Sequence, residues 1–124
     1  TAAYRQANAA VNNQLEFVVG VAEDMVEATV LAVVVNDGAA NSVDLAPGIG
    51  LDTTTANVAT IFPTAANLGS SLRQFQIATY KGIPAAGKHF LSWLEYSTAL
   101  GTTTWAGDNN SPQTQAGITG AIWS

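Results

Sequence analysis

The segment from Lys81 to Trp123, KGIPAAGKHFLSWLEYSTALGTTTWAGDNNSPQTQAGITGAIW, carries the clearest folding signal in this chain. Two glycine-containing turns precede an aromatic-rich run in which successive side chains point to opposite faces, as they do along a β-strand. A threonine run and a final apolar run follow. The segment therefore predicts strands at residues 88–97, 102–106 and 118–123. Because the last apolar run ends one residue before the final position, we expect a terminal head domain or a subunit that packs against copies of itself.

The same two-residue alternation occurs upstream, beginning with Leu15, Phe17, Val19 and Val21. It predicts further short strands at residues 15–21, 29–35, 43–51, 58–62 and 72–80. The break at Pro47-Gly48 favours a bulge or an edge strand within 43–51. About eight short strands separated by turn signals, with little helix, are typical of an all-β antiparallel sandwich or barrel, and a Greek-key β-sandwich fits best.

The length and the local patterns indicate one domain with an N-terminal extension. A chain of 124 residues is long enough for a single core. Residues 1–14 are rich in Ala, Asn and Gln, and the Asn12-Asn13 pair weakens a helix there and suits a turn. We therefore expect residues 1–14 to form a connector or N-terminal arm, and residues 15–124 to form the β-sandwich head domain.

The surface of this domain must be poor in charge. Charged residues make up 10% of the chain and apolar residues 48%, whereas soluble domains carry roughly 25% charged residues. Thr, Asn, Ser, Gln and Ala cover the surface instead. Such a surface suits an extracellular or virion protein, and it also suits an obligate oligomer that buries an uncharged patch. An ordinary monomer with a neutral surface is the alternative.

Charge and hydropathy exclude several classes of partner. The net charge is −5, and the four basic residues are scattered rather than gathered in a stripe, so we expect no nucleic-acid binding. The longest apolar stretch, Ala28 to Val35, is too short to span a bilayer, so we expect no membrane insertion. The chain has no cysteine, which excludes disulfides, thiol nucleophiles and zinc–thiolate sites.

No catalytic group stands out in the sequence. His89, the only histidine, falls in mid-strand, where a packed or hydrogen-bonded imidazole is the usual outcome. The carboxylates are dispersed. Glu95 is the most interesting of them, because it lies within a predicted strand and would need a partner such as Arg73 or a threonine hydroxyl if it were buried. We therefore predict a protein that is not an enzyme, with no catalytic residue, cofactor or metal ligand.

The best candidate for a receptor-binding site lies beside the loop that follows the threonine run. Trp105 is followed closely by Asp108, Asn109 and Asn110. An exposed indole can cover the apolar face of a sugar while nearby polar side chains bind its hydroxyls. We therefore expect these four residues to contact a receptor. The alternatives are that Trp105 packs in the core or a subunit contact, and that residues 108–110 form a solvated turn or supply oxygen ligands to calcium.

The sequence resembles a family of viral proteins along residues 15–123, most specifically at 82–123. The resemblance is carried by Gly87–Glu95 (GKHFLSWLE), Gly101–Asp108 (GTTTWAGD), Gly117–Trp123 (GITGAIW) and Gly48–Asp52 (GIGLD). These runs look like the C-terminal head domains of trimeric fibres from tailed bacteriophages, which are similar in plan to the tumour-necrosis-factor-like jelly roll. The resemblance implies a jelly-roll homotrimer and carries over no functional residue.

A trimeric jelly roll would explain two segments that are apolar on both faces, residues 29–35 and 118–123. One face would fill the sandwich and the other would meet a neighbouring subunit. We therefore expect one or both segments to lie in the subunit-facing sheet.

Three functions remain open at this point. The first is a virion attachment module, a trimeric phage fibre head that binds a host surface glycan or protein receptor and lies on the virion, outside the cell. The second is a capsid decoration or head-fibre protein that contacts other virion proteins. The third, a glycan-degrading enzyme, rests on the dispersed carboxylates alone.

Overall fold

The computed structural model describes residues 3–9, 11–36, 44–59, 65–66, 74–99, 101–106 and 116–123. Within these ranges the chain forms nine strands and two short 3-10 turns, without an α-helix. The elements are β1 (Arg5–Gln6), η1 (Ala7–Ala9), η2 (Val11–Asn13), β2 (Gln14–Val19), β3 (Met25–Asn36), β4 (Asp44–Leu51), β5 (Ala65–Ala66), β6 (Gln74–Gly82), β7 (Gly87–Ser97), β8 (Thr103–Ala106) and β9 (Gly117–Trp123).

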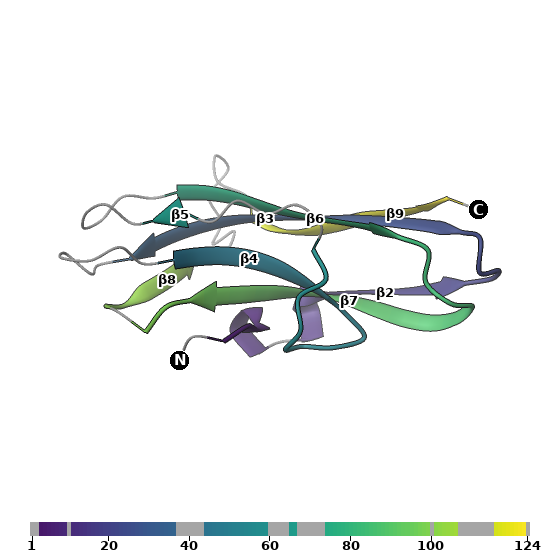
Figure 1. Cartoon of the computed structure of the whole chain (residues 1–124), viewed down its shortest axis with the longest axis horizontal. Helices are drawn as coiled ribbons and strands as arrows, with labels where there is room; N and C mark the ends of the chain where they lie inside the picture. Colours follow the sequence, from purple (N-terminus) through teal and green to yellow (C-terminus); the bar gives the residue numbers. More distant parts are fainter. Residues whose placement is uncertain are drawn as a thin grey trace.

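The strands form two antiparallel sheets that pack face to face (Figure 1). In the first, called here the β7 sheet, β7 lies between β4 on one side and β1 and β2 on the other, and β5 pairs with β4. In the second, the β3 sheet, β3 lies between β6 on one side and β8 and β9 on the other. The predicted all-β antiparallel sandwich is therefore confirmed.

The order in which the chain visits the sheets is that of a jelly roll. The chain passes from β2 in the β7 sheet to β3, back to β4, and later from β6 in the β3 sheet to β7 and back to β8 and β9. Successive long strands thus lie in opposite layers and pair with strands distant in sequence. Interlocked Greek keys of this kind define the double-sheet jelly roll.

The core lies between the two sheets and is built from alternate residues of the central strands. From β3 the even-numbered side chains point inward, among them Val26, Ala28 and Val30, which are at most 3% exposed. From the β7 sheet, Ile49 and Leu91 pack against them. Strand alternation explains this division, since every second side chain of a strand points to the same face.

The chain itself covers the outer face of the β7 sheet. Residues 52–59 fold back over it, and the Ser92 hydroxyl donates a hydrogen bond of 2.6 Å to the Thr53 carbonyl oxygen. Close approach is possible because two positions of β4 are glycine: a Cβ at Gly48 would lie 2.7 Å from the Tyr4 ring, and one at Gly50 would overlap the Thr53 carbonyl. The outer face of the β3 sheet is covered unevenly: Val33 is 1% exposed, whereas Phe75 and Ile77 are 65% and 47% exposed.

The predicted strand at residues 58–62 is wrong where the structure describes it. Val58 and Ala59 lie in an irregular loop, and residues 60–62 lie outside the described ranges. The Val58 N–H donates to the Ile49 carbonyl oxygen at 2.7 Å, as neighbouring strands of a sheet do. The Asn57 carboxamide then accepts from both Ile49 N–H and Ala59 N–H, so a side chain takes the place of the next strand bond.

The N-terminal extension takes part in the sandwich. Within residues 1–14, the described strand β1 pairs with β7 through Arg5 opposite Glu95 and Gln6 opposite Leu94. The next residue, Ala7, is 2% exposed and belongs to the main hydrophobic cluster. This segment therefore brings a positive charge to the edge of the β7 sheet.

Candidate functional site

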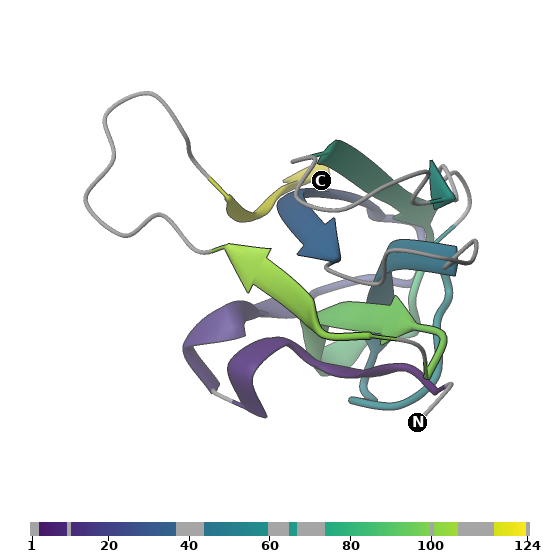
Figure 2. The same cartoon turned by 90° about the vertical axis from the view of Figure 1, so that its left-hand side faces the viewer.

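A cavity of about 1020 Å³ opens between β7 and β8, at the end of the sandwich where the N-terminal segment lies. Figure 2 views that end, with β8 in light green above the N-terminal segment in purple. Two tryptophans and two opposite charges line the cavity, together with neutral polar side chains. The lining residues are Arg5, Gln6, Ala7, Asn8, Asn13, Thr54, Thr55, Trp93, Glu95, Thr103, Thr104 and Trp105.

Trp105 is the one predicted receptor-binding residue that the structure places. It lies in β8 opposite Val34 of β3, so its side chain points into the space between the sheets. The ring is half-buried and packs against the core, which corrects the expectation of an exposed ring beside the loop. The strand β8 continues to Ala106, and alternation along β8 turns Trp105 inward. Asp108, Asn109 and Asn110 lie outside the described residues.

Trp93 enters the cavity from the opposite sheet. It is 6% exposed, as its place in the alternating run predicted. Among the described residues its buried indole Nε1 has no hydrogen-bond partner, and neither has that of Trp105. Burying an N–H without an acceptor costs about 1–3 kcal/mol. Both atoms are fully buried, so an acceptor brought by a ligand or water reaches them only if the rings turn towards the cavity.

Glu95 supplies the negative charge of the cavity and is 7% exposed. Burial raises its pKa to about 7, although the nearby Arg5 guanidinium acts in the opposite direction. The Arg5 Nε atom lies 3.8 Å from the Glu95 carboxylate, a loose ion pair whose arginine side chain is largely exposed. The partner suggested by the sequence, Arg73, lies outside the described residues. Arg5 was missed because residues 1–14 carry no strand pattern.

The remaining lining groups are neutral donors and acceptors. Some of them are fixed by their own hydrogen bonds: Asn13 Nδ2 donates to the Ala7 carbonyl oxygen at 2.7 Å, and Thr103 Oγ1 accepts from Asn36 Nδ2 at 2.7 Å. No cluster of three or more metal-ligating side chains occurs in the described ranges. The cavity can therefore offer hydrogen bonds, an ion pair and aromatic surface.

His89 lies far from this cavity along β7 and is held as a structural group, as the sequence predicted. Its Nδ1 atom lies 2.6 Å from Asp52 Oδ2, and its Nε2 atom lies 2.7 Å from the Ala85 carbonyl oxygen. These two hydrogen bonds raise the pKa of His89, because both accept a proton from the imidazolium. With both ring nitrogens engaged, His89 has no free nitrogen to act as a base.

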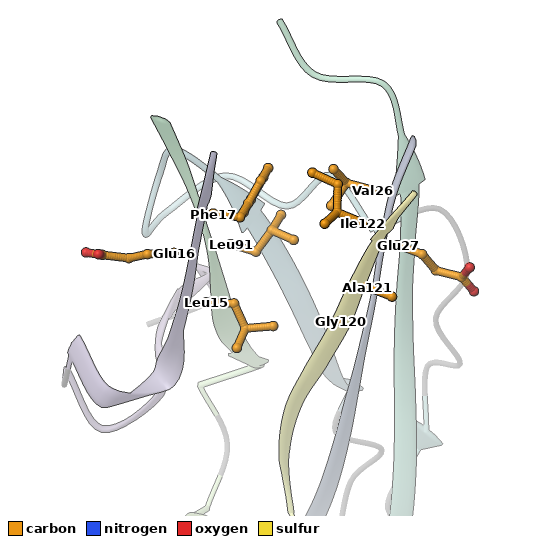
Figure 3. Close-up of a pocket in the computed structure, with 9 residues that line it drawn as sticks. All are labelled: Leu15, Glu16, Phe17, Val26, Glu27, Leu91, Gly120, Ala121 and Ile122. Carbon is orange, nitrogen blue, oxygen red and sulfur yellow. The ribbon is translucent and has the colours of Figure 1, made fainter. Parts of the chain in front are cut away.

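A second, smaller cavity of about 170 Å³ lies between the free edges of β2 and β9 (Figure 3). Leu15, Phe17 and Leu91 face Val26 and Ile122 across it. The carboxylates of Glu16 and Glu27, which lie at its margins, point away from the space between the sheets. The inward groups are apolar, so this cavity offers packing surface and no chemistry.

The outer face of the β3 sheet carries several exposed apolar side chains. Strand β6 places Phe75 and Ile77 there, 65% and 47% exposed, and β9 adds Trp123, which is 51% exposed. The odd-numbered residues of β3 share this face, including the half-buried Leu31. The charged side chains on it, Glu27 and Lys81, stand opposite each other in register. Apolar side chains therefore lie at both ends of this face, and a row of threonines and the balanced charge pair lie between them.

Comparison of the chain with protein-family models, with curated proteins and with solved structures finds no match in any of the three. In the described part of the chain, no helix has the length and apolar character needed to cross a bilayer. Function is therefore inferred from the chemistry of the two surfaces described above, the cavity between β7 and β8 and the outer face of the β3 sheet.

Proposed function

We propose that this chain is a non-enzymatic virion protein, the head domain of a homotrimeric fibre of a tailed bacteriophage, and that it attaches the particle to a receptor on the host surface. The outer face of the β3 sheet is the observation that carries the proposal. Exposed apolar patches of this kind mark interaction surfaces. The resemblance of residues 82–123 to phage fibre heads supports the viral assignment.

A second copy of the chain is the partner that suits this face. It carries one acidic and one basic residue in register, Glu27 and Lys81, so copies of the face do not repel one another. Both segments that the sequence shows to be apolar on two faces, 29–35 and 118–123, lie in the β3 sheet. In a trimer each outer face packs against neighbours around a threefold axis, which removes Phe75, Ile77 and Trp123 from water.

The receptor site is assigned to the end of the sandwich that holds Trp105. The cavity there combines aromatic rings with neutral polar groups, as small-ligand sites do. The outer face of the β3 sheet lies apart from Trp105, whose side chain points between the sheets. Assembly and receptor binding therefore use different side chains and can be separated by mutation.

Sedimentation equilibrium and a cell-binding assay test the two parts of the proposal. The purified chain is expected to sediment as a trimer at micromolar concentration, and a fluorescent form is expected to bind host cells. Trp105→Ala should abolish cell binding and leave the trimer intact. A monomer contradicts the assembly, and full binding by Trp105→Ala contradicts the receptor site.

The recessed position of Trp105 favours a second candidate, a capsid decoration or head-fibre subunit that cements a lattice. A protein of that kind needs the same apolar face but no ring presented to a host cell. The two candidates differ in where the protein lies. Many copies spread over the capsid in an image of the intact particle would support decoration, whereas a few copies at the tail would support attachment.

A further inference from the structure

We propose that the cavity between β7 and β8 binds a neutral, hydroxyl-rich saccharide through Trp93, Trp105 and Glu95. The inference names the ligand class for the attachment function proposed above and rests on it. The cavity is built from two sheets and the N-terminal segment, so it is a feature of the folded sandwich rather than of one loop. Its volume of about 1020 Å³ is at the upper end of the range of ligand pockets.

The two indole N–H groups beside the cavity are donors that lack an acceptor among the described residues. Trp93 is more than nine-tenths buried, and the Nε1 atoms of Trp93 and Trp105 are fully buried with no acceptor in the described part of the chain. Buried donors in folded proteins nearly always have a partner from the protein, from water or from a ligand. Sugar hydroxyls are acceptors as well as donors, so they can pair with these N–H groups once the rings turn towards the cavity.

The lining of the cavity combines apolar and polar groups. Trp105, whose ring is half-buried, gives an apolar surface from one sheet, and the buried Trp93 lies on the other side of the cavity. An apolar ring surface suits the C–H faces of a pyranose ring. Around them stand hydroxyl and carboxamide groups that both donate and accept hydrogen bonds. A purely apolar ligand would leave those groups unpaired, at a cost in affinity. A polyhydroxylated ring pairs with both kinds of surface.

The charge of the cavity lining favours neutral sugars over acidic ones. The charged groups lining the cavity are Glu95, which is buried, and Arg5, which is exposed and lies 3.8 Å from it. The carboxylate of a uronic or sialic acid would stand near that of Glu95, and the two would repel each other in a poorly solvated place. A neutral hydroxyl donates to Glu95 instead, in a charge-assisted hydrogen bond.

Binding of a neutral sugar therefore depends on the ionisation of Glu95. Arg5 faces it from β1, Pro47 stands opposite it in β4, and β8 contributes only Thr103, Thr104 and Trp105 to the cavity. Burial brings the pKa of Glu95 to about 7. Because the carboxylate accepts a hydroxyl more strongly than the acid does, affinity is expected to rise by about tenfold as pH increases through 7.

The three tryptophans make the test specific. Trp93 and Trp105 line the cavity, whereas Trp123 lies in β9 outside it and serves as an internal reference. Indole N–H signals of the full chain are recorded by NMR at pH 8, with neutral hexose and N-acetylhexosamine oligosaccharides added to about 10 mM, a concentration that detects even weak sites. Uronic- and sialic-acid oligosaccharides are tested in parallel. We expect neutral sugars to shift the Trp93 and Trp105 signals and to leave that of Trp123 unchanged.

Variants assign the binding to the named side chains. Trp105→Ala should weaken affinity at least about tenfold, because it removes a ring face and a donor. Glu95→Gln keeps the shape of the side chain and should abolish the pH dependence. Ile83→Ala, at an exposed position that does not line the cavity, is the matched control and should bind as the parent does.

Several outcomes overturn the inference. These are the absence of any shift with neutral sugars, a shift confined to Trp123, a preference for the acidic oligosaccharides, or unchanged pH dependence in Glu95→Gln. Sedimentation of the same samples keeps this result separate from the proposed assembly. A trimer that binds no sugar refutes the cavity alone, and a monomer that binds neutral sugars refutes the trimer alone.

Discussion

At the scale of single residues, the glycines of β4 show how close packing fixes residue choice. Gly50 lies under the turn formed by residues 52–55, and a Cβ there would overlap the Thr53 carbonyl and come within 2.7 Å of Ser92 Oγ. Backbone atoms cannot rotate away as a flexible side chain can. The loop that covers the β7 sheet therefore depends on the absence of a side chain at this position.

Gly50→Ala is accordingly expected to lower the free energy of unfolding by about 1–3 kcal/mol, the usual cost of overpacking. Gly117→Ala is the matched control, because a Cβ at Gly117 meets no atom within 4 Å. Urea unfolding followed by tryptophan fluorescence measures both. Equal stability of the two variants would show that the loop is not held against β4.

The ion pair between His89 and Asp52 predicts a window of pH in which it stabilises the fold. Hydrogen bonds raise the pKa of His89, so its contribution is complete below about 6.5 and is lost as pH rises through its folded pKa. Burial opposes ionisation of Asp52, but hydrogen bonds from His89 and from the Phe90 N–H outweigh it and lower its pKa. That contribution is lost at the acid end, as pH falls below about 4.

Urea unfolding of the wild-type chain and of His89→Gln is compared at pH 5.5, about one pH unit below the ordinary pKa of histidine, and at pH 8. The urea midpoint of the wild-type chain is expected to be higher at pH 5.5 than at pH 8, and to fall by more over this range than that of His89→Gln. Parallel pH dependence of the two proteins would show that folding does not change the pKa of the imidazole.

Glu95 predicts a pH dependence of its own. Its folded pKa of about 7 lies above the ordinary value of 4.5, so the folded state holds the proton more tightly and stability falls as pH rises between these values. A shift of this size corresponds to about 3 kcal/mol. Glu95→Gln should be more stable than wild type at pH 8, by up to that amount, and nearly equal at pH 4.5. A less stable variant at pH 8 would mean that Arg5 outweighs the cost of burial.

At the scale of strands, alternation located most elements but did not orient them. The run at 74–80 separates Gln74 and Gln76 from Phe75 and Ile77, and hydrophobicity alone would turn the aromatic side inward. Pairing with β3 does the opposite: Gln76 is 1% exposed and Phe75 is 65% exposed. The inward face of a strand is set by its register with its neighbours, which no local pattern contains.

The candidate site was predictable only in part, because local patterns mark single residues but not the contacts between strands. Trp105 and Glu95 stand out from the sequence because a ring beside a polar loop and a carboxylate in a strand are both unusual. Their proximity depends on the packing of β7 against β8, and the ion pair of Glu95 depends on the pairing of β1 with β7. These are contacts between residues far apart in sequence, so local patterns give no sign of them.

Strand position also predicts how stability is distributed. Strand β3 has partners on both sides, while β9 pairs with β3 alone among the described strands, and its residues from Thr119 to Trp123 are exposed. Amide hydrogen exchange is expected to be slow at Val30 and Ala32 and at least about tenfold faster in β9, because edge strands open locally. Equal protection of β9 in dilute solution would indicate an unseen partner on its free edge.

At the scale of the whole molecule, the outer faces of the two sheets differ in how far they are covered. Residues 52–59 and Tyr4 cover the outer face of the β7 sheet, whereas the outer face of the β3 sheet carries exposed Phe75, Ile77 and Trp123. With charged residues at 10% of the chain, little charge is available to make that face soluble. The proposed trimer buries it, so assembly and folding stability are linked in this protein.

This linkage gives a prediction that distinguishes assembly from a merely apolar surface. If copies associate only when folded, the melting temperature must rise with protein concentration, since mass action then favours the folded state. Phe75→Glu places a charge at a 65% exposed apolar position of this face and should yield a monomer whose melting temperature no longer depends on concentration. Val18→Glu makes the same chemical change at a site 68% exposed on the other sheet and should remain trimeric. Calorimetry over a hundredfold range of concentration, with light scattering on the same samples, measures both. For a trimer that dissociates when it unfolds, this range corresponds to about 5.4 kcal/mol per trimer, or about 1.8 kcal/mol per chain. A wild-type melting temperature independent of concentration would mean that the exposed face serves a different partner.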